Sequence, residues 1–178
     1  MIETEQQVVV NAGIEPTWNY AKDMQRWASI MPGYQECQII DDDNSRWVLK
    51  VGVGAMVRTV KVLVHVERWA GPEAVDFTFK LEGDPVTGGG SYRATPQGSG
   101  ATDVRLKVQV AGTGPMAPMW EAMGGPVLPK FAKGFAEQLK AMIEQAVGVA
   151  PAQPAPAKRS LLARIGDWLR GLWRSVFA

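Results

Sequence analysis

Few residues of this 178-residue chain could carry out acid–base, nucleophilic or metal chemistry. Its one histidine, His65, alternates with apolar residues on the same side as Lys61 and Glu67, which is typical of a solvated strand residue. Its one cysteine, Cys37, has no histidine close to it in the sequence, so we expect a half-buried structural thiol. One histidine and one cysteine cannot readily supply the three or four ligands of a zinc site. We therefore expect neither a metal nor a covalently bound cofactor.

Two other motifs have chemical associations. The acidic run Asp41–Asp43 lies between two strand-like segments, where we expect a solvated turn; a docking patch is the alternative. The glycine run Gly88–Gly90 is not a phosphate-binding loop, because no Lys-Ser/Thr pair follows it and a strand comes next. We expect these glycines to mark a bend or a bulge in a curving sheet.

The strand-like segments instead share an apolar face. Apolar and polar residues alternate along residues 47–53, 57–69, 75–81 and 104–110, as in strands with one buried face. Candidates for ligand contact on these faces are Trp47, Leu49, Val60, Val62, Val64, Phe77, Phe79, Val104 and Leu106. The same faces also carry Val51, Val53, Leu81 and Val108. None of these side chains can act as an acid, base or nucleophile, so we predict an interior that binds rather than catalyses.

A second apolar group is rich in methionine, which adapts to ligands of varied shape. Its members are Met116, Met119, Trp120, Met123, Val127, Leu128 and Phe131. Core packing alone would explain them. The alternative is that they cover an apolar cavity, with neighbouring Gly and Pro residues allowing a gate to open. Arg58 and Arg68 could orient a ligand there or form salt bridges at its rim.

The order of elements predicts an α+β fold for residues 1–147. A first strand over 6–10 and a helix over 17–31 precede an antiparallel meander of about six strands. A helix over 119–147 follows, interrupted or kinked near Gly124–Pro126 and possibly at Pro129. This helix is the only element large enough to cover the apolar face of the sheet. We expect a cavity between the two, where small molecules often bind.

Residues 148–157 form a Pro/Ala linker that we expect to favour polyproline geometry, with a reach of about 30 Å. Beyond it, residues 158–178 have large apolar residues at helical spacing and arginines on the opposite side. The predicted membrane-binding residues are Arg159, Leu161, Leu162, Arg164, Ile165, Trp168, Leu169, Arg170, Leu172, Trp173, Arg174, Val176 and Phe177. The tail is too charged to span a bilayer, so we predict a helix lying in the membrane interface. Packing on its own domain or on a partner is the alternative.

Charge is distributed unevenly along the chain. Residues 158–178 carry five basic side chains and one acidic, which leaves −3 for residues 1–157 out of a net +1. A mildly acidic body argues against nucleic acid as a partner, whereas a basic tail favours an anionic membrane surface. The single cysteine and an N-terminus without signal-peptide features indicate a cytoplasmic protein, peripheral on the inner face of the cell membrane.

The chain resembles a known family in four segments: Met31–Tyr34, Trp47–Val53 followed by Gly54, Val66–Arg68 and Gly88–Tyr92. Together with the element order, these are similar to the START-like, SRPBCC or helix-grip superfamily. Within it, the chain is most similar to the CoxG-like family, which is named for carbon monoxide dehydrogenase. The resemblance implies a curved antiparallel sheet of about seven strands around a long C-terminal helix. It also implies a non-catalytic accessory protein of molybdenum-containing carbon monoxide dehydrogenases or related hydroxylases.

These observations predict a carrier that holds a lipophilic small molecule, most simply a quinone, and is tethered to the membrane by its tail. The family resemblance links such proteins with membrane recruitment of the enzyme and with quinone transport. Two alternatives stay open. One is a recruitment adaptor without a functional ligand, and the other is an enzyme like the polyketide cyclases and dehydratases of the same superfamily.

Overall fold

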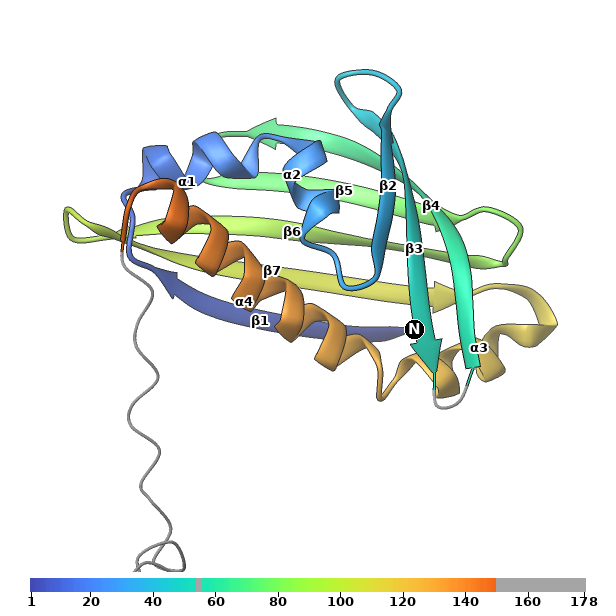
Figure 1. Ribbon diagram of the computed structural model, residues 1–178. Coiled ribbons are helices and arrows are strands. Elements are labelled where there is room, and N and C mark those ends of the chain that lie inside the picture. The colour runs from blue at the N-terminus through green and yellow to red at the C-terminus, as the bar shows by residue number, and fades with distance from the viewer. Residues whose placement is uncertain (54–55, 150–178) are drawn as a thin grey trace, which may run out of the picture.

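The computed structural model describes residues 1–53 and 56–149 (Figure 1). Seven antiparallel strands form one sheet in the order β1-β7-β6-β5-β4-β3-β2. Their bounds are β1 (Ile2–Val10), β2 (Tyr34–Ile39), β3 (Asn44–Val53), β4 (Met56–Ala70), β5 (Ala74–Leu81), β6 (Val86–Gln97) and β7 (Ala101–Gly112). The helices are α1 (Ile14–Ala21), α2 (Met24–Ser29), η1 (Gly114–Met116), α3 (Ala117–Gly124) and α4 (Leu128–Ala146).

Figure 1 shows α4 lying across the concave face of this sheet, with β2 and β3 turned sharply away from the direction of β6 and β7. The predicted seven-stranded antiparallel sheet around a long C-terminal helix is thus confirmed. Alternation decides which side chains face the helix, because successive residues of a strand point to opposite faces. Trp47 of β3 pairs with Val62 of β4, and both are buried on this concave face.

The glycines of β6 make room for aromatic rings of β5. Gly88 pairs with Phe79 and Gly90 with Phe77. A Cβ atom at Gly90 would lie 2.7 Å from Cζ of Phe77 and 2.4 Å from the carbonyl oxygen of Lys107. We predicted a bend or a bulge at Gly88–Gly90. Pairing of β6 with both neighbours is continuous here, so the bulge is wrong. The glycines are needed because a side chain would displace the rings that cover them.

The predicted helix over 17–31 is instead two helices. The chain leaves α1 after Ala21, and Asp23 begins α2 by accepting hydrogen bonds from the backbone N–H groups of Gln25 (2.9 Å) and Arg26 (3.2 Å). An aspartate in this position satisfies free N–H groups at a helix start, so it favours a new helix over continuation of the old one.

The predicted interruption at Gly124–Pro126 is confirmed, because α3 ends at Gly124 and α4 begins at Leu128. Pro129 introduces no second break. It lies in the first turn of α4, where the missing N–H costs no helical hydrogen bond. The first strand begins at Ile2, earlier than predicted, because pairing with β7 extends through its polar N-terminal half.

The C-terminal end of α4 is fixed to the end of β1. The buried carboxylate of Glu144 accepts hydrogen bonds from the backbone N–H and the side-chain amide of Asn11, both at 2.8 Å, and pairs with Lys140 at 2.5 Å. Burial alone would raise the pKa of Glu144, but the hydrogen bonds from Lys140 and Asn11 outweigh it and lower that pKa. The charged form of Glu144 therefore holds this end of the helix on the sheet.

No helix within residues 1–53 and 56–149 is both long enough and apolar enough to cross a membrane. The predicted tail helix over 158–178 and most of the predicted linker over 148–157 lie outside the described residues. Their roles remain predictions from sequence.

Replacing Gly90 by alanine should lower the free energy of unfolding by about 1–3 kcal/mol, because the new methyl group overlaps Phe77 and the β7 backbone. Gly100→Ala is the matched control, since nothing lies within 4 Å of a Cβ atom there, and it should change stability by no more than about 0.5 kcal/mol. Urea unfolding measures both. Equal stabilities of the two variants would contradict the proposed role of the glycine.

Candidate functional site

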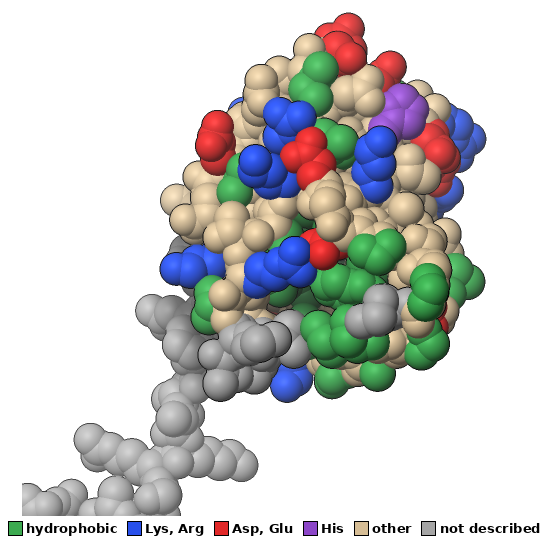
Figure 2. All heavy atoms as spheres, turned by 90° about the vertical axis from the view of Figure 1, so that its right-hand side faces the viewer, with side chains coloured by type: hydrophobic (Ala, Val, Ile, Leu, Met, Phe, Trp, Pro, Cys, Tyr) green, Lys and Arg blue, Asp and Glu red, His purple; other side chains and the backbone are tan. Residues whose placement is uncertain are grey.

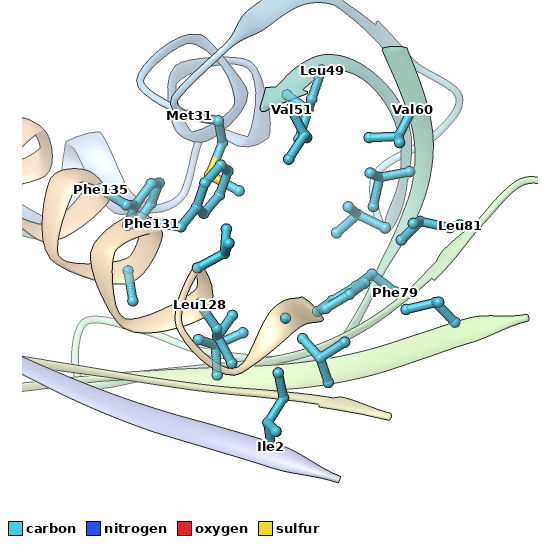
Figure 3. Close-up of a pocket in the computed structure, with 18 of the residues that line it drawn as sticks. Ile2, Met31, Leu49, Val51, Val60, Phe79, Leu81, Leu128, Phe131 and Phe135 are labelled. Carbon is cyan, nitrogen blue, oxygen red and sulfur yellow. The ribbon is translucent and has the colours of Figure 1, made fainter. Parts of the chain in front are cut away.

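A cavity of about 300 Å³ lies between the N-terminal half of α4 and the concave face of the sheet. Figure 3 shows side chains from α4, β3, β4 and β5 pointing into it, with Ile2 of β1 below. Most of the lining residues are aliphatic or aromatic: Ile2, Trp27, Met31, Trp47, Leu49, Val51, Val60, Val62, Val64, Phe77, Phe79, Leu81, Val86, Leu106, Val108, Val110, Trp120, Met123, Val127, Leu128, Phe131, Ala132 and Phe135. Ser91, Lys107, Glu121 and two glycines complete the lining.

The structure brings most of the sequence-predicted site residues together around this cavity. Those in the lining are Trp47, Leu49, Val60, Val62, Val64, Phe77, Phe79, Leu106, Trp120, Met123, Val127, Leu128 and Phe131. Val104 is not among them: the cavity follows β7 along Leu106, Val108 and Val110, and Val104 is fully buried beyond its inner end. Met119 points outward and is 43% exposed. The side chain of Met116 lies outside the described part of the structure, so its predicted place at the cavity stays a prediction.

Several lining residues were missed by sequence reasoning. Trp27 and Met31 enter the cavity because α2 packs beside the sheet, and no local pattern indicates that arrangement. Ile2 was missed because the rest of its half of β1 is polar. Phe135 could have been found, since it lies four residues after Phe131 and therefore on the same side of α4.

On the side of α2 the cavity ends against an aromatic cluster centred on Trp27. The ring centroid of Trp27 lies 5.4 Å from that of Phe135, 5.9 Å from that of Tyr92 and 6.1 Å from that of Phe77. Aromatic pairs in such edge-on or tilted contacts each stabilise a fold by about 0.5–1.5 kcal/mol beyond their burial. The cluster gives this end of the cavity an aromatic wall.

Three large hydrophobic side chains outside the cavity lining are exposed at the α3 end of the domain. We call Met1, Val57 and Met119 the apolar rim; their exposed fractions are 71%, 62% and 43%. Figure 2 shows hydrophobic side chains gathered at the lower right of this face, with most of the charged side chains above them and to their left. Large exposed apolar residues gathered in one place are typical of an interaction surface.

The charged groups near the cavity are paired with one another. Lys107 forms a salt bridge with Glu3 at 3.1 Å, and Glu121 binds the N-terminal ammonium group at 2.5 Å. Arg58 pairs with Asp84 at 2.9 Å, and its guanidinium group lies 5.9 Å from the centroid of the Trp120 ring. The interior therefore faces a ligand with hydrocarbon rather than with free charge.

Arg68 lies outside the lining of the cavity. A β-bulge between Val66 and Arg68 shifts the register of β4, and Arg68 pairs with Asp76 at 2.8 Å. Of the two roles considered for Arg58 and Arg68, salt bridging is the one that the structure supports.

The side chains that the sequence analysis considered for chemistry, His65, Cys37 and Asp41, lie apart from the cavity. Nδ1 of exposed His65 lies 2.9 Å from the side-chain oxygen of Asn44. The pKa of the Cys37 thiol is raised, mainly by burial and to a smaller extent by the negative charge of Asp23. A raised pKa disfavours the thiolate, which is the reactive form. Asp41 accepts hydrogen bonds from the Asn44 side chain and from turn N–H groups, which lower its pKa. The predicted solvated histidine and solvated turn are confirmed.

Comparison with known protein families now identifies the domain. The family described as "Polyketide cyclase / dehydrase and lipid transport" matches residues 1–146. The chain belongs to this family. Its domain has the START-like helix-grip fold, in agreement with the fold that the resemblance implied. No curated protein sequence matches the chain.

Several solved structures share the fold. A conserved protein from Geobacillus kaustophilus is 18% identical with a TM-score of 0.71, covering 82% of this chain and 97% of its own. A START superfamily protein from Mycobacterium smegmatis is 16% identical with a TM-score of 0.63, covering 81% and 98%. The Zhui aromatase/cyclase from Streptomyces sp. R1128 is 16% identical with a TM-score of 0.62, covering 85% and 99%. At such identities the fold is shared, and function has to be argued from the site.

The cavity should take up an apolar fluorescent probe such as N-phenyl-1-naphthylamine. Val62 is buried and lines the cavity, so Val62→Phe fills part of the space and should weaken binding of the probe about tenfold or more. Val9→Phe is the control, because Val9 is 41% exposed on β1 and does not line the cavity. Fluorescence titration measures both. Unchanged binding by Val62→Phe would place the probe elsewhere.

Proposed function

We propose that this protein is a non-catalytic, membrane-tethered carrier of a lipophilic small molecule. The single observation that carries the proposal is the apolar cavity, whose charged neighbours among the described residues are already paired. A family that includes lipid transport proteins supports the same conclusion.

Water in such a cavity would find few partners, whereas an apolar ligand would gain by leaving water. Each 100 Å² of apolar surface moved from water into the cavity contributes roughly 2.5 kcal/mol. The volume of about 300 Å³ suits a small ring system or the head of a longer lipid. A ligand of this kind also stabilises the folded state, because it binds the folded protein and not the unfolded chain.

We propose a quinone as this ligand. A flat ring would lie against aromatic side chains such as Phe77, Phe79 and Phe131, all of which line the cavity. The resemblance to the CoxG-like family supports the same ligand. It also supports a molybdenum-containing oxidoreductase of the carbon monoxide dehydrogenase type as the partner enzyme, recruited or served at the cytoplasmic membrane.

The two ends of the domain give the predicted tail a geometric role. α4 begins at Leu128 beside the cavity and ends at Ala146 on the far side of the domain (Figure 1). Its 19 residues correspond to about 28 Å. The predicted linker of residues 148–157 reaches about 30 Å, which is enough to return to the level of the apolar rim. A tail bound at a membrane would therefore still let the cavity open towards the same surface.

Native mass spectrometry of the full chain tests the carrier function. We expect one lipophilic molecule per chain, released by organic solvent, and less of it in the Val62→Phe variant because the cavity is partly filled. Added quinone should raise the thermal midpoint of ligand-free protein. Absence of any bound molecule, together with no stabilisation by quinone, would contradict the proposal. Turnover of a polyketide substrate would favour the enzyme alternative.

The tail is tested separately with liposomes. Replacing Trp168 and Trp173 by glutamate should abolish binding of the full chain to anionic liposomes, because charge replaces the apolar side of the helix. Replacing both by leucine should preserve most binding. Sedimentation with liposomes measures this, and unchanged urea unfolding shows that the domain is intact. Undiminished binding of the glutamate variant would place the membrane contact elsewhere.

A further inference from the structure

Two buried side-chain atoms have no hydrogen-bond partner in the described part of the chain: Nε1 of Trp27 and the hydroxyl oxygen of Tyr92. Trp27 is 8% exposed and Tyr92 is fully buried. Other indole groups nearby are satisfied. Nε1 of Trp47 donates to Oγ of Ser45 at 2.8 Å, and Nε1 of Trp69 donates to Oδ1 of Asp43 at 2.9 Å.

An unpartnered buried donor is costly, at about 1–3 kcal/mol, and native proteins keep few of them. The two groups differ in position. Trp27 lines the cavity, whereas Tyr92 lies behind it, in contact with Trp27 but outside the lining. A partner for Tyr92 would have to enter the packed core, but a partner for Trp27 can arrive as part of a ligand.

Trp27 also has space on its other side. A small hollow of about 30 Å³ lies there, lined by Trp27 together with side chains of α1, α2, β3, β4 and β5. These side chains are all apolar apart from indole N–H groups, so a water molecule would find too few of the two to four partners it needs. The hollow gives the indole ring room to tilt, and it supplies no acceptor of its own.

We propose that Trp27 anchors the ligand of the cavity by donating a hydrogen bond from Nε1 to a carbonyl oxygen. The inference rests on the proposed carrier function and specifies the ligand class. The ligand is a lipophilic molecule with an acceptor oxygen on the part that lies deepest, against the aromatic cluster. Nε1 is buried among its neighbours, so the indole ring has to tilt towards the ligand for the bond to form. A pure hydrocarbon leaves the donor unpaired and is discriminated against.

Equilibrium dialysis of the full chain with two probes that share one carbon skeleton tests this anchor. The probes are a dimethylnaphthoquinone, fully substituted on its quinone ring so that it does not add to Cys37, and the corresponding dimethylnaphthalene. Trp27→Phe removes the donor and should weaken the quinone about tenfold relative to the hydrocarbon. The hydrocarbon corrects for the space that the smaller ring leaves.

Tyr92→Phe is the matched control, because it removes the other unpartnered group of the same cluster without changing the cavity lining. It should leave the ratio of the two affinities within about twofold and the stability of ligand-free protein unchanged or higher. An unchanged ratio in Trp27→Phe, or an equal change in Tyr92→Phe, would overturn the anchor while the carrier function stands. If the wild-type protein bound neither the quinone nor the hydrocarbon, the carrier function would be overturned, and the anchor with it.

Discussion

The site depends on one constraint: α4 packs against the concave face of the sheet with its C-terminal half and lines the cavity with its N-terminal half. Leu139 and Ile143, in the C-terminal half of α4, are fully buried, and each stabilises the fold by about 2–3 kcal/mol. Glu144 adds hydrogen bonds to Asn11 at the same end. In the N-terminal half, Leu128 and Phe131 line a cavity instead of meeting the sheet. The helix is thus held firmly at one end while the other end covers an empty space.

That arrangement requires a sheet that curves away from the helix without collapsing onto it. Close approach of the Phe77 and Phe79 rings to Gly90 and Gly88 shapes the floor of the space. Large rings lying over bare backbone give a smooth apolar wall, and the break at residues 125–127 lets α3 cover the outer end as a separate helix. Interiors are normally close-packed, so a persistent void of this size is itself an argument for a ligand.

Electrostatics keep this interior neutral. Charges beside the cavity are held at its edge by opposite charges, as with Glu121 and the N-terminal ammonium group. The reactive side chains, His65 and Cys37, lie on other parts of the sheet. The proposed carrier function requires such an interior, because apolar contacts hold a lipophilic molecule away from water. The exposed apolar rim is suited to contact with a membrane or a partner protein that supplies or accepts the lipophilic ligand.

The sequence by itself determined the sheet, its inward face and most of the cavity lining, whereas only the tertiary structure decided where the cavity begins and ends. Period-two alternation is a local signal, so Trp47 and Leu49 could be assigned to one face without knowing their neighbours. The break after Gly124 was also local, since two glycines and a proline cannot continue a helix. Val104 continues the alternation of β7 yet lies beyond the inner end, and Trp27 enters the lining because α2 packs beside the sheet. These positions depend on how elements distant in sequence meet, and the physical reason is packing, which periodicity along a single segment does not encode.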